Sequence, residues 1–293
     1  MSVFSAVYDR LYTPKNREII EHSVVALSVL GFLAHLVFIF LANHLRNPPP
    51  LVSEAGHNYL TAIATPFNFI LFYEVLILIS AIPQSTTKSI ETQFEIVSLI
   101  FIRGFFQDIA EIDLDRIKVS ATELMPAIQD VVAGIVMFFL VTVFRHITRK
   151  RDGSREMSPA LVTFINRKKA VSLALTVLFF ALAGRNIWRF AVELARGSVQ
   201  FHTGFYAEVF TVMIFTDVLI LLLSLLVSDH YELVFRNAAF VISTILIRTA
   251  LTAGHPDGAE EGVAGMVFGI LTVLIYNYYV GVAVGRKAAG PVS

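Results

Sequence analysis

Long apolar runs separated by short polar segments dominate the pattern of this chain. Eight of these runs contain about 20 residues, which is the length that a helix needs to cross roughly 30 Å of hydrocarbon. The polar segments between them hold most of the charged residues. The predicted spans are residues 22–43, 60–82, 89–109, 123–145, 169–192, 205–228, 232–253 and 262–284.

Two of the eight runs carry charges inside the apolar pattern. The third is interrupted by Glu91, Glu95, Arg103 and Asp108. The seventh carries Arg236 and Arg248. Because a bilayer offers no hydrogen bonds to an exposed backbone, we expect both runs to be helices that face protein. The sequence thus predicts an all-α, polytopic membrane protein with eight transmembrane helices.

Composition supports this class and excludes several others. The chain has 293 residues, of which 56% are hydrophobic and 16% charged, whereas soluble domains are richer in charge. The formal net charge of zero gives no bias toward nucleic acid. Cysteine is absent, which excludes disulfides and thiolate metal sites. No metal-ligand spacing, cofactor motif or nucleophile–base pattern is visible, so we expect neither a cofactor nor an enzyme.

The distribution of Lys and Arg predicts the orientation. If the N-terminus is cytoplasmic, inside segments hold 15 Lys and Arg residues and outside segments hold 4. Eight of the 15 lie between the fourth and fifth spans, which predicts a basic cytoplasmic linker over residues 151–168. This asymmetry favours an inner-membrane protein with both termini in the cytoplasm. The basic linker is explained by this rule, although recognition of lipid headgroups is an alternative.

The two halves of the chain resemble each other span by span. The clearest match joins Phe72–Leu78 to Phe215–Leu221, and each copy holds one acid, Glu74 or Asp217. Three further matches follow in the same order: Ala26–Leu30 with Ala174–Leu178, Ser98–Arg103 with Ser243–Arg248, and Asp130–Val136 with Glu261–Val267. Since each unit has four spans, the copies have the same polarity in the membrane. We expect two parallel four-helix repeats, at residues 1–150 and 169–293.

The charges inside the apolar runs are the candidate site. Ionised groups in a membrane are costly and often functional. Glu74 lies about 12 Å from the cytoplasmic edge of its span. It is therefore closer to the cytoplasm than Arg103 and Asp130, which lie at similar depths. The depths therefore predict the pairs Arg103–Asp130 and Arg248–Glu261. Glu74 and Asp217 are left without an assured basic partner, and become candidate proton or ion sites with Glu95.

Two functions remain open from these residues. The first is a transporter or channel for protons or small ions, in which Glu74, Asp217 and Glu95 titrate or bind ions. The second is a membrane adaptor or stress-response protein, in which the buried charges only specify helix packing. His35, on an apolar face of the first span, is expected to make an interhelical hydrogen bond. The partners implied are the bilayer and a small ion, and the oligomeric state is not predicted.

Each half also resembles the four-helix phosphate-starvation-inducible E membrane family. The residues that carry the resemblance are Phe69–Glu74, Ile100–Arg103, the run after Asp130, Phe215–Leu221 and Ile245–Arg248. The chain departs from that family by being duplicated and by having Asp217 where the family has glutamate. The resemblance implies an inner-membrane protein with a link to stress, and it implies no reaction.

Overall fold

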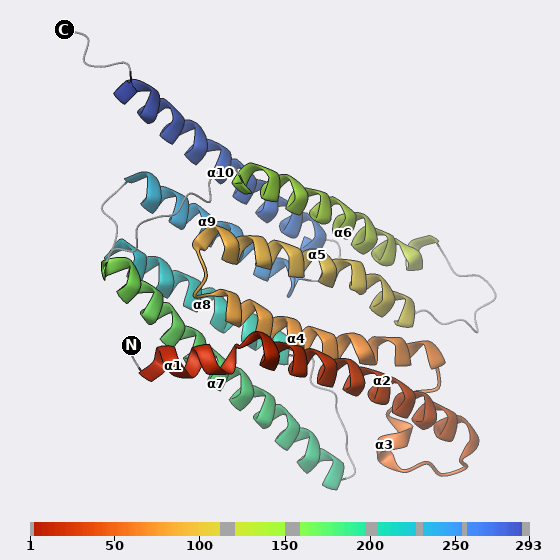
Figure 1. Ribbon diagram of the computed structural model, residues 1–293. Helices are drawn as coiled ribbons and strands as arrows, with labels where there is room; N and C mark the ends of the chain where they lie inside the picture. Colours follow the sequence, from red (N-terminus) through yellow and green to blue (C-terminus); the bar gives the residue numbers. More distant parts are fainter. Residues whose placement is uncertain are drawn as a thin grey trace.

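A computed structural model describes residues 3–111, 121–149, 159–196, 204–226, 231–253 and 257–288. These residues form helices joined by short turns, with no strand among them, and the long helices run side by side (Figure 1). The elements are α1 Val3–Leu11, α2 Pro14–His44, α3 Pro50–Ser53, the 3₁₀ helix η1 Tyr59–Ile63, α4 Ala64–Ala81, α5 Thr86–Glu111, α6 Ala121–Thr148, α7 Pro159–Ala195, α8 Phe205–Leu225, α9 Tyr231–Ala250 and α10 Asp257–Ala288.

Within the described residues, seven helical segments are long and apolar enough to cross a membrane. They are Pro14–His44, Tyr59–Ala81, Leu124–Thr148, Leu161–Ala195, Phe205–Leu225, Tyr231–Ala250 and Asp257–Gly281. The predicted span 89–109 is not among them, because α5 carries the charged residues that interrupt its apolar pattern. This helix nevertheless packs against α4, α6, α9 and α10, so it lies inside the bundle.

Helices that follow each other in the chain also pack against each other. In the first half, α2 contacts α4, α4 contacts α5, and α5 contacts α6. In the second half, α7 contacts α8, α8 contacts α9, and α9 contacts α10. The halves meet where α6 contacts α10, α5 contacts α9, and α4 contacts α7. The described ends of α1 and α10 lie at the same end of the bundle (Figure 1). That end also holds the turn between α4 and α5.

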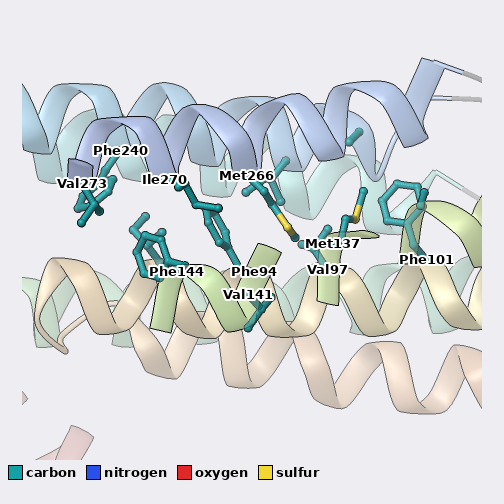
Figure 2. Close-up of a cluster of buried hydrophobic side chains, with 14 residues drawn as sticks. Phe94, Val97, Phe101, Met137, Val141, Phe144, Phe240, Met266, Ile270 and Val273 are labelled. Carbon is teal, nitrogen blue, oxygen red and sulfur yellow. The ribbon is translucent and has the colours of Figure 1, made fainter. Parts of the chain in front are cut away.

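The largest hydrophobic core joins both halves. It is formed by α5, α6, α9 and α10, with Phe94, Met137, Phe144, Phe240 and Met266 fully buried (Figure 2). A second core joins α4, α7 and α8 around Ile79, Phe179 and Met213. Long aliphatic side chains on α2 and α8 instead point outward, which is typical of a surface in contact with lipid.

Two glycines bring neighbouring helices close together. A Cβ atom at Gly134 of α6 would lie 2.9 Å from the backbone nitrogen of Ile102 in α5. A Cβ atom at Gly265 of α10 would lie 3.2 Å from the carbonyl oxygen of Ser243 in α9. The Ser243 hydroxyl donates a hydrogen bond to the Gly265 carbonyl at 2.7 Å. The small residues at these two positions therefore permit close packing of α5 with α6 and of α9 with α10.

Two helices begin earlier than the hydrophobic pattern predicts. Helix α2 starts at Pro14, because the Thr13 side chain caps it by accepting a hydrogen bond from the Asn16 backbone N–H. Helix α7 starts at Pro159, so the second part of the predicted linker 151–168 is helical. Residues 151–158 of that linker lie outside the described residues. The early start of α7 brings Lys168 and Lys169 into the folded bundle.

Candidate functional site

Glu74 and Arg103 form an ion pair between α4 and α5. Both side chains are largely buried, with 7% of the Glu74 side chain and 15% of the Arg103 side chain exposed. Arg103 also donates from Nε to the Leu99 carbonyl of its own helix, at 3.2 Å. The prediction that Glu74 lacks a basic partner is therefore corrected by the structure.

Asp217 and Arg248 form the corresponding ion pair between α8 and α9. This pair is also buried, with 10% of the Asp217 side chain and 3% of the Arg248 side chain exposed. Arg248 donates a second hydrogen bond from Nη2 to Oε1 of Gln93, at 3.2 Å. Because Gln93 belongs to α5, this arginine connects the second half of the chain to the first.

The direction of the side chains explains why these arginines have different partners from those predicted. Arg103 lies 17 residues after the first residue of α5, Thr86, and Arg248 lies 17 residues after the first residue of α9, Tyr231. The Cα–Cβ bonds of a helix tilt toward its N-terminus. Because α4 and α5 are antiparallel, the Glu74 side chain leans toward one end of the bundle and the Arg103 side chain leans toward the other, so the two approach each other. The same holds for Asp217 and Arg248. The difference in depth between their Cα atoms is therefore smaller at the ends of the side chains.

Asp130 and Glu261, the predicted partners, occupy other positions. Asp130 is buried against α5, where a Cβ atom at Gly104 would clash with its Oδ2. It thus lies against the residue that follows Arg103, while Arg103 pairs with Glu74. Glu261 lies near the start of α10, directly after the first-turn acids Asp257 and Glu260.

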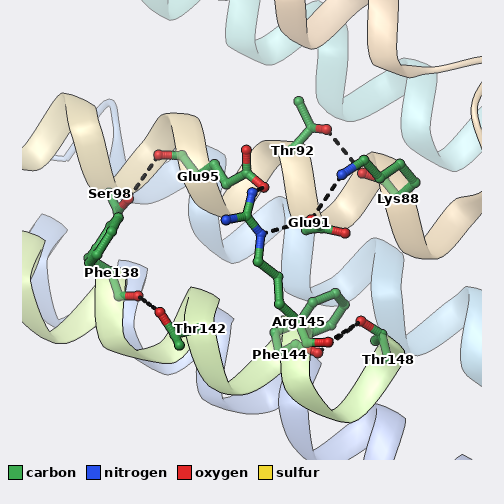
Figure 3. Close-up of polar contacts among 10 residues, drawn as sticks. All are labelled: Lys88, Glu91, Thr92, Glu95, Ser98, Phe138, Thr142, Phe144, Arg145 and Thr148. Atoms are coloured by element: carbon green, nitrogen blue, oxygen red, sulfur yellow. Dashed lines mark hydrogen bonds and ion pairs between the residues drawn. The ribbon is translucent and has the colours of Figure 1, made fainter. Parts of the chain in front are cut away.

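Glu95 belongs to a third group of charges, between α5 and α6. Arg145 of α6 pairs with both Glu91 and Glu95, and its Nε lies 2.9 Å from Glu91 Oε1 (Figure 3). Lys88 approaches the same Glu91 oxygen at 2.9 Å. About half of the Arg145 side chain is exposed, so solvent screens this network more than it screens the two buried pairs.

A cavity of about 1150 Å³ opens at the end of the bundle that holds these charges. Its wall is built by α5, α6, α7, α9 and α10, and by the turn before α5. Among the described residues, five lysines and arginines line it: Lys88, Arg145, Arg149, Lys168 and Arg236. The described lining contains one acid, Glu91, and includes neither Glu74 nor Asp217. The cavity is therefore basic, and it ends short of the two buried pairs.

Lys168 connects this cavity to the second buried pair. Its side chain is buried in the wall of the cavity, where Nζ donates a hydrogen bond to the Gln84 carbonyl at 2.6 Å. It also interacts electrostatically with Asp217. The sequence gives Lys168 only as one of many basic residues beside the linker. Its spacing from Ser172 and Thr176, one helical turn each, is the signal that places all three on the buried face of α7.

Side chains from α1 and α7 cap the last carbonyl groups of α4. The Tyr8 hydroxyl donates to the Ser80 carbonyl at 2.6 Å, and the Ser172 hydroxyl donates to the Ile79 carbonyl at 2.8 Å. Lys169 of α7 forms an ion pair with Asp9 of α1 at 2.7 Å. These contacts attach the N-terminal helix to the bundle, a role that the sequence did not indicate.

Two residues outside the buried pairs can also be placed. His35 shares a 2.6 Å hydrogen bond through Nδ1 with the Thr65 hydroxyl of α4, which confirms its predicted interhelical contact. Arg185, at the other end of the bundle from the cavity, forms an exposed ion pair with Glu208. The latter pair is a useful control, because it has the same chemistry as the buried pairs without the burial.

No family model matches this chain, and no curated protein or solved structure matches it significantly. Within the described residues, no three His, Asp or Glu side chains cluster in a way that would hold a metal ion. The candidate site is thus defined by its own geometry, which consists of two buried acid–arginine pairs and a basic cavity.

Proposed function

We propose that this protein moves protons or small ions across the cytoplasmic membrane, and that the two buried acid–arginine pairs are the sites that respond to the transported species. The observation that carries the proposal is the recurrence of the pair. In each half, an acid on one helix meets an arginine on the next, with similar burial. Ionisable residues within membrane-spanning helices are rare, and they commonly mark ion or proton pathways.

The architecture that we propose for this function is two parallel four-helix repeats with eight spans. Support comes from the matching order of helix contacts in the halves and from the position of α5 inside the bundle. Helix α4 pairs through Glu74 with α5, as α8 pairs through Asp217 with α9. The excess of Lys and Arg at the end that holds the cavity favours cytoplasmic termini.

An acid–arginine pair can couple a proton to a movement of helices. A proton on the carboxylate removes the charge that holds the guanidinium, so the arginine is left without its counter-ion in a low-dielectric setting. Such an unpaired charge is costly, which favours a rearrangement of the two helices that carry the pair. A bound cation would compete with the arginine for the carboxylate in the same way.

Ion flux in proteoliposomes tests this proposal. We expect wild-type protein to dissipate a proton or ion gradient, and a Glu74→Gln, Asp217→Asn double variant to lose that flux. Glu208→Gln is the matched control, because it removes an exposed acid from an ion pair with Arg185. Absence of wild-type flux under gradients of protons, sodium, potassium and chloride would contradict the proposal.

A second candidate function is a membrane adaptor or stress-response protein that transports nothing. The observation that favours it is the lining of the cavity, which reaches neither buried acid. In that case the pairs would only fix how α4 meets α5 and α8 meets α9. The resemblance to the phosphate-starvation-inducible E family, which implies a stress link, stays a prediction under either function.

A further inference from the structure

Helix α1, Val3–Leu11, turns polar side chains toward the bundle and large apolar side chains away from it. Ser5 and Tyr8 are buried. Phe4, Val7 and Leu11 are instead exposed, at 60%, 50% and 38%. A helix that docks on a protein in water normally buries its apolar side, since removal of apolar surface from water is favourable. The reversed arrangement of α1 therefore indicates that its exposed apolar side chains do not face water.

The three exposed apolar residues form one stripe along α1, which we call the α1 stripe. Val7 follows Phe4 by three positions and Leu11 follows Val7 by four, which are the spacings of neighbours on one helix face. Ala6 is also exposed, but it lies roughly half a turn around the helix axis from Phe4 and Leu11. The exposed surface of α1 thus has an apolar flank and a flank without large apolar groups.

Polar contacts fix the helix in this orientation. The Tyr8 hydroxyl donates to the Ser80 carbonyl at 2.6 Å. The Lys169 ammonium pairs with Asp9 at 2.7 Å and donates to the Ser5 hydroxyl at 3.1 Å. Asp9 therefore has its counter-ion within the protein. A rotation of α1 that buried the stripe against the bundle would break these contacts.

Helix α1 lies at the level where α4 ends, and it packs along α7 (Figure 1). Its hydrogen-bond acceptor Ser80 is the penultimate residue of α4, so α1 is placed at one edge of an apolar membrane-length segment. Leu11 and Phe180 of α7 line the same small pocket, of about 60 Å³. Phe180 is itself exposed on the outside of the bundle. The stripe is therefore continuous with the apolar outer surface of α7.

We propose that the α1 stripe is inserted among lipids, so that α1 is an interfacial helix at the membrane edge where α4 ends. Its continuity with the outer surface of α7 favours lipid as the occupant, because the bilayer that surrounds Phe180 reaches Leu11 beside it. An interfacial helix places its apolar side in the boundary between headgroups and acyl chains. This lipid contact is independent of the proposed ion transport, since α1 holds neither buried pair.

Spin labels on single cysteines test the proposal in lipid nanodiscs that hold one copy of the full chain. Because the chain has no cysteine, Phe4→Cys, Leu11→Cys and Ala6→Cys each carry one label. Power saturation measures collisions of each label with oxygen, which concentrates among acyl chains, and with a nickel chelate, which stays in water. We expect the oxygen-to-nickel ratio to be at least about fivefold higher at positions 4 and 11 than at position 6, because only the stripe lies among lipids.

A reference and a spare position complete the experiment. Val177→Cys, on the exposed surface of α7, gives the ratio for a site within the bilayer, and positions 4 and 11 should lie between it and position 6. If a label at position 4 or 11 disturbs α1, Val7→Cys replaces it with the same expectation.

Two results would overturn the proposal. Frequent nickel collisions at positions 4 and 11, equal to those at position 6, would place the stripe in water. Rare collisions with both reagents at positions 4 and 11 would mean that protein covers the stripe, and with one copy in each nanodisc the cover would come from the same chain.

Discussion

At each buried pair, an acid and an arginine meet with most of both side chains removed from solvent. Asp217 meets Arg248, and Gln93, Thr244 and Lys168 are polar neighbours of this pair. The mutual attraction offsets the cost of removing both charges from water, and little net stabilisation remains. The stability of the fold therefore depends on keeping the pair complete or removing it completely.

Breaking the pair from one side should be strongly destabilising. We expect Arg248→Met to lower the free energy of unfolding by about 3–5 kcal/mol, because Asp217 is left buried without its counter-ion. The double variant Asp217→Leu, Arg248→Met should recover most of that loss, since both charges are gone. Unfolding in mixed micelles by increasing denaturing detergent measures both values. A double variant no more stable than Arg248→Met would show that the pair acts through more than its charges.

The exposed pair provides the control for this measurement. Glu208→Gln should change the free energy of unfolding by less than about 1 kcal/mol, because water screens the charges that remain. A loss as large as that of Arg248→Met would mean that burial is not what makes the inner pairs sensitive.

The identity of the charged residues was readable from the sequence, but their partners were not. An acid in an apolar run is visible in Phe72–Leu78 and Phe215–Leu221. The arginine that each acid meets depends on the direction of the two side chains and on the angle at which their helices cross. The position of a residue along one helix determines neither.

At the scale of the helices, small residues set how closely α5 meets α6 and α9 meets α10. We expect Gly134→Ala to cost about 1–3 kcal/mol of unfolding free energy, because its Cβ atom would meet the backbone of Ile102. Gly184→Ala is the control, since no atom lies within 4 Å of its added Cβ atom. It should be neutral or stabilising, as alanine favours a helix. Equal effects of the two substitutions would argue against close packing at Gly134.

The N-terminal helix is held by specific contacts and is therefore open to a local test. Burial raises the pKa of the Tyr8 hydroxyl, so it remains a neutral donor to the Ser80 carbonyl at any physiological pH. We expect Tyr8→Phe to leave that acceptor unsatisfied and to loosen α1 by about 1–3 kcal/mol. Faster proteolysis within residues 3–11, with the rest of the chain still resistant, would show this. Unchanged proteolysis would mean that the Asp9–Lys169 pair and packing hold α1 without the hydrogen bond.

Helix positions were largely predictable, and their ends were less so. Hydrophobic length located the seven helical segments that are long and apolar enough to cross a membrane, whereas α5 falls outside that set because of its charged residues. The early starts of α2 and α7 depend on a cap at Thr13 and on polar residues that become buried through tertiary contacts. The same tertiary contacts turn Lys168 from an apparent orientation signal into part of a cavity wall.

At the scale of the whole molecule, the number of spans decides where the ends of the chain lie. With α5 as a span, both termini lie on the same side of the membrane, and without it they lie on opposite sides. Because the chain has no cysteine, Ser2→Cys and Ser293→Cys each introduce a single thiol. We expect a membrane-impermeant maleimide to label both only after the membrane is permeabilised. Labelling of one terminus in intact cells would contradict eight spans.

The most direct test of the account measures ion flux in the variant that removes a buried pair without unbalancing it. Asp217→Leu, Arg248→Met is expected to remain folded, so a loss of function cannot be ascribed to unfolding. In proteoliposomes, we predict that this double variant loses the flux that wild type and Glu208→Gln carry. Wild-type flux that persists unchanged in the folded double variant would contradict the role of this pair in transport.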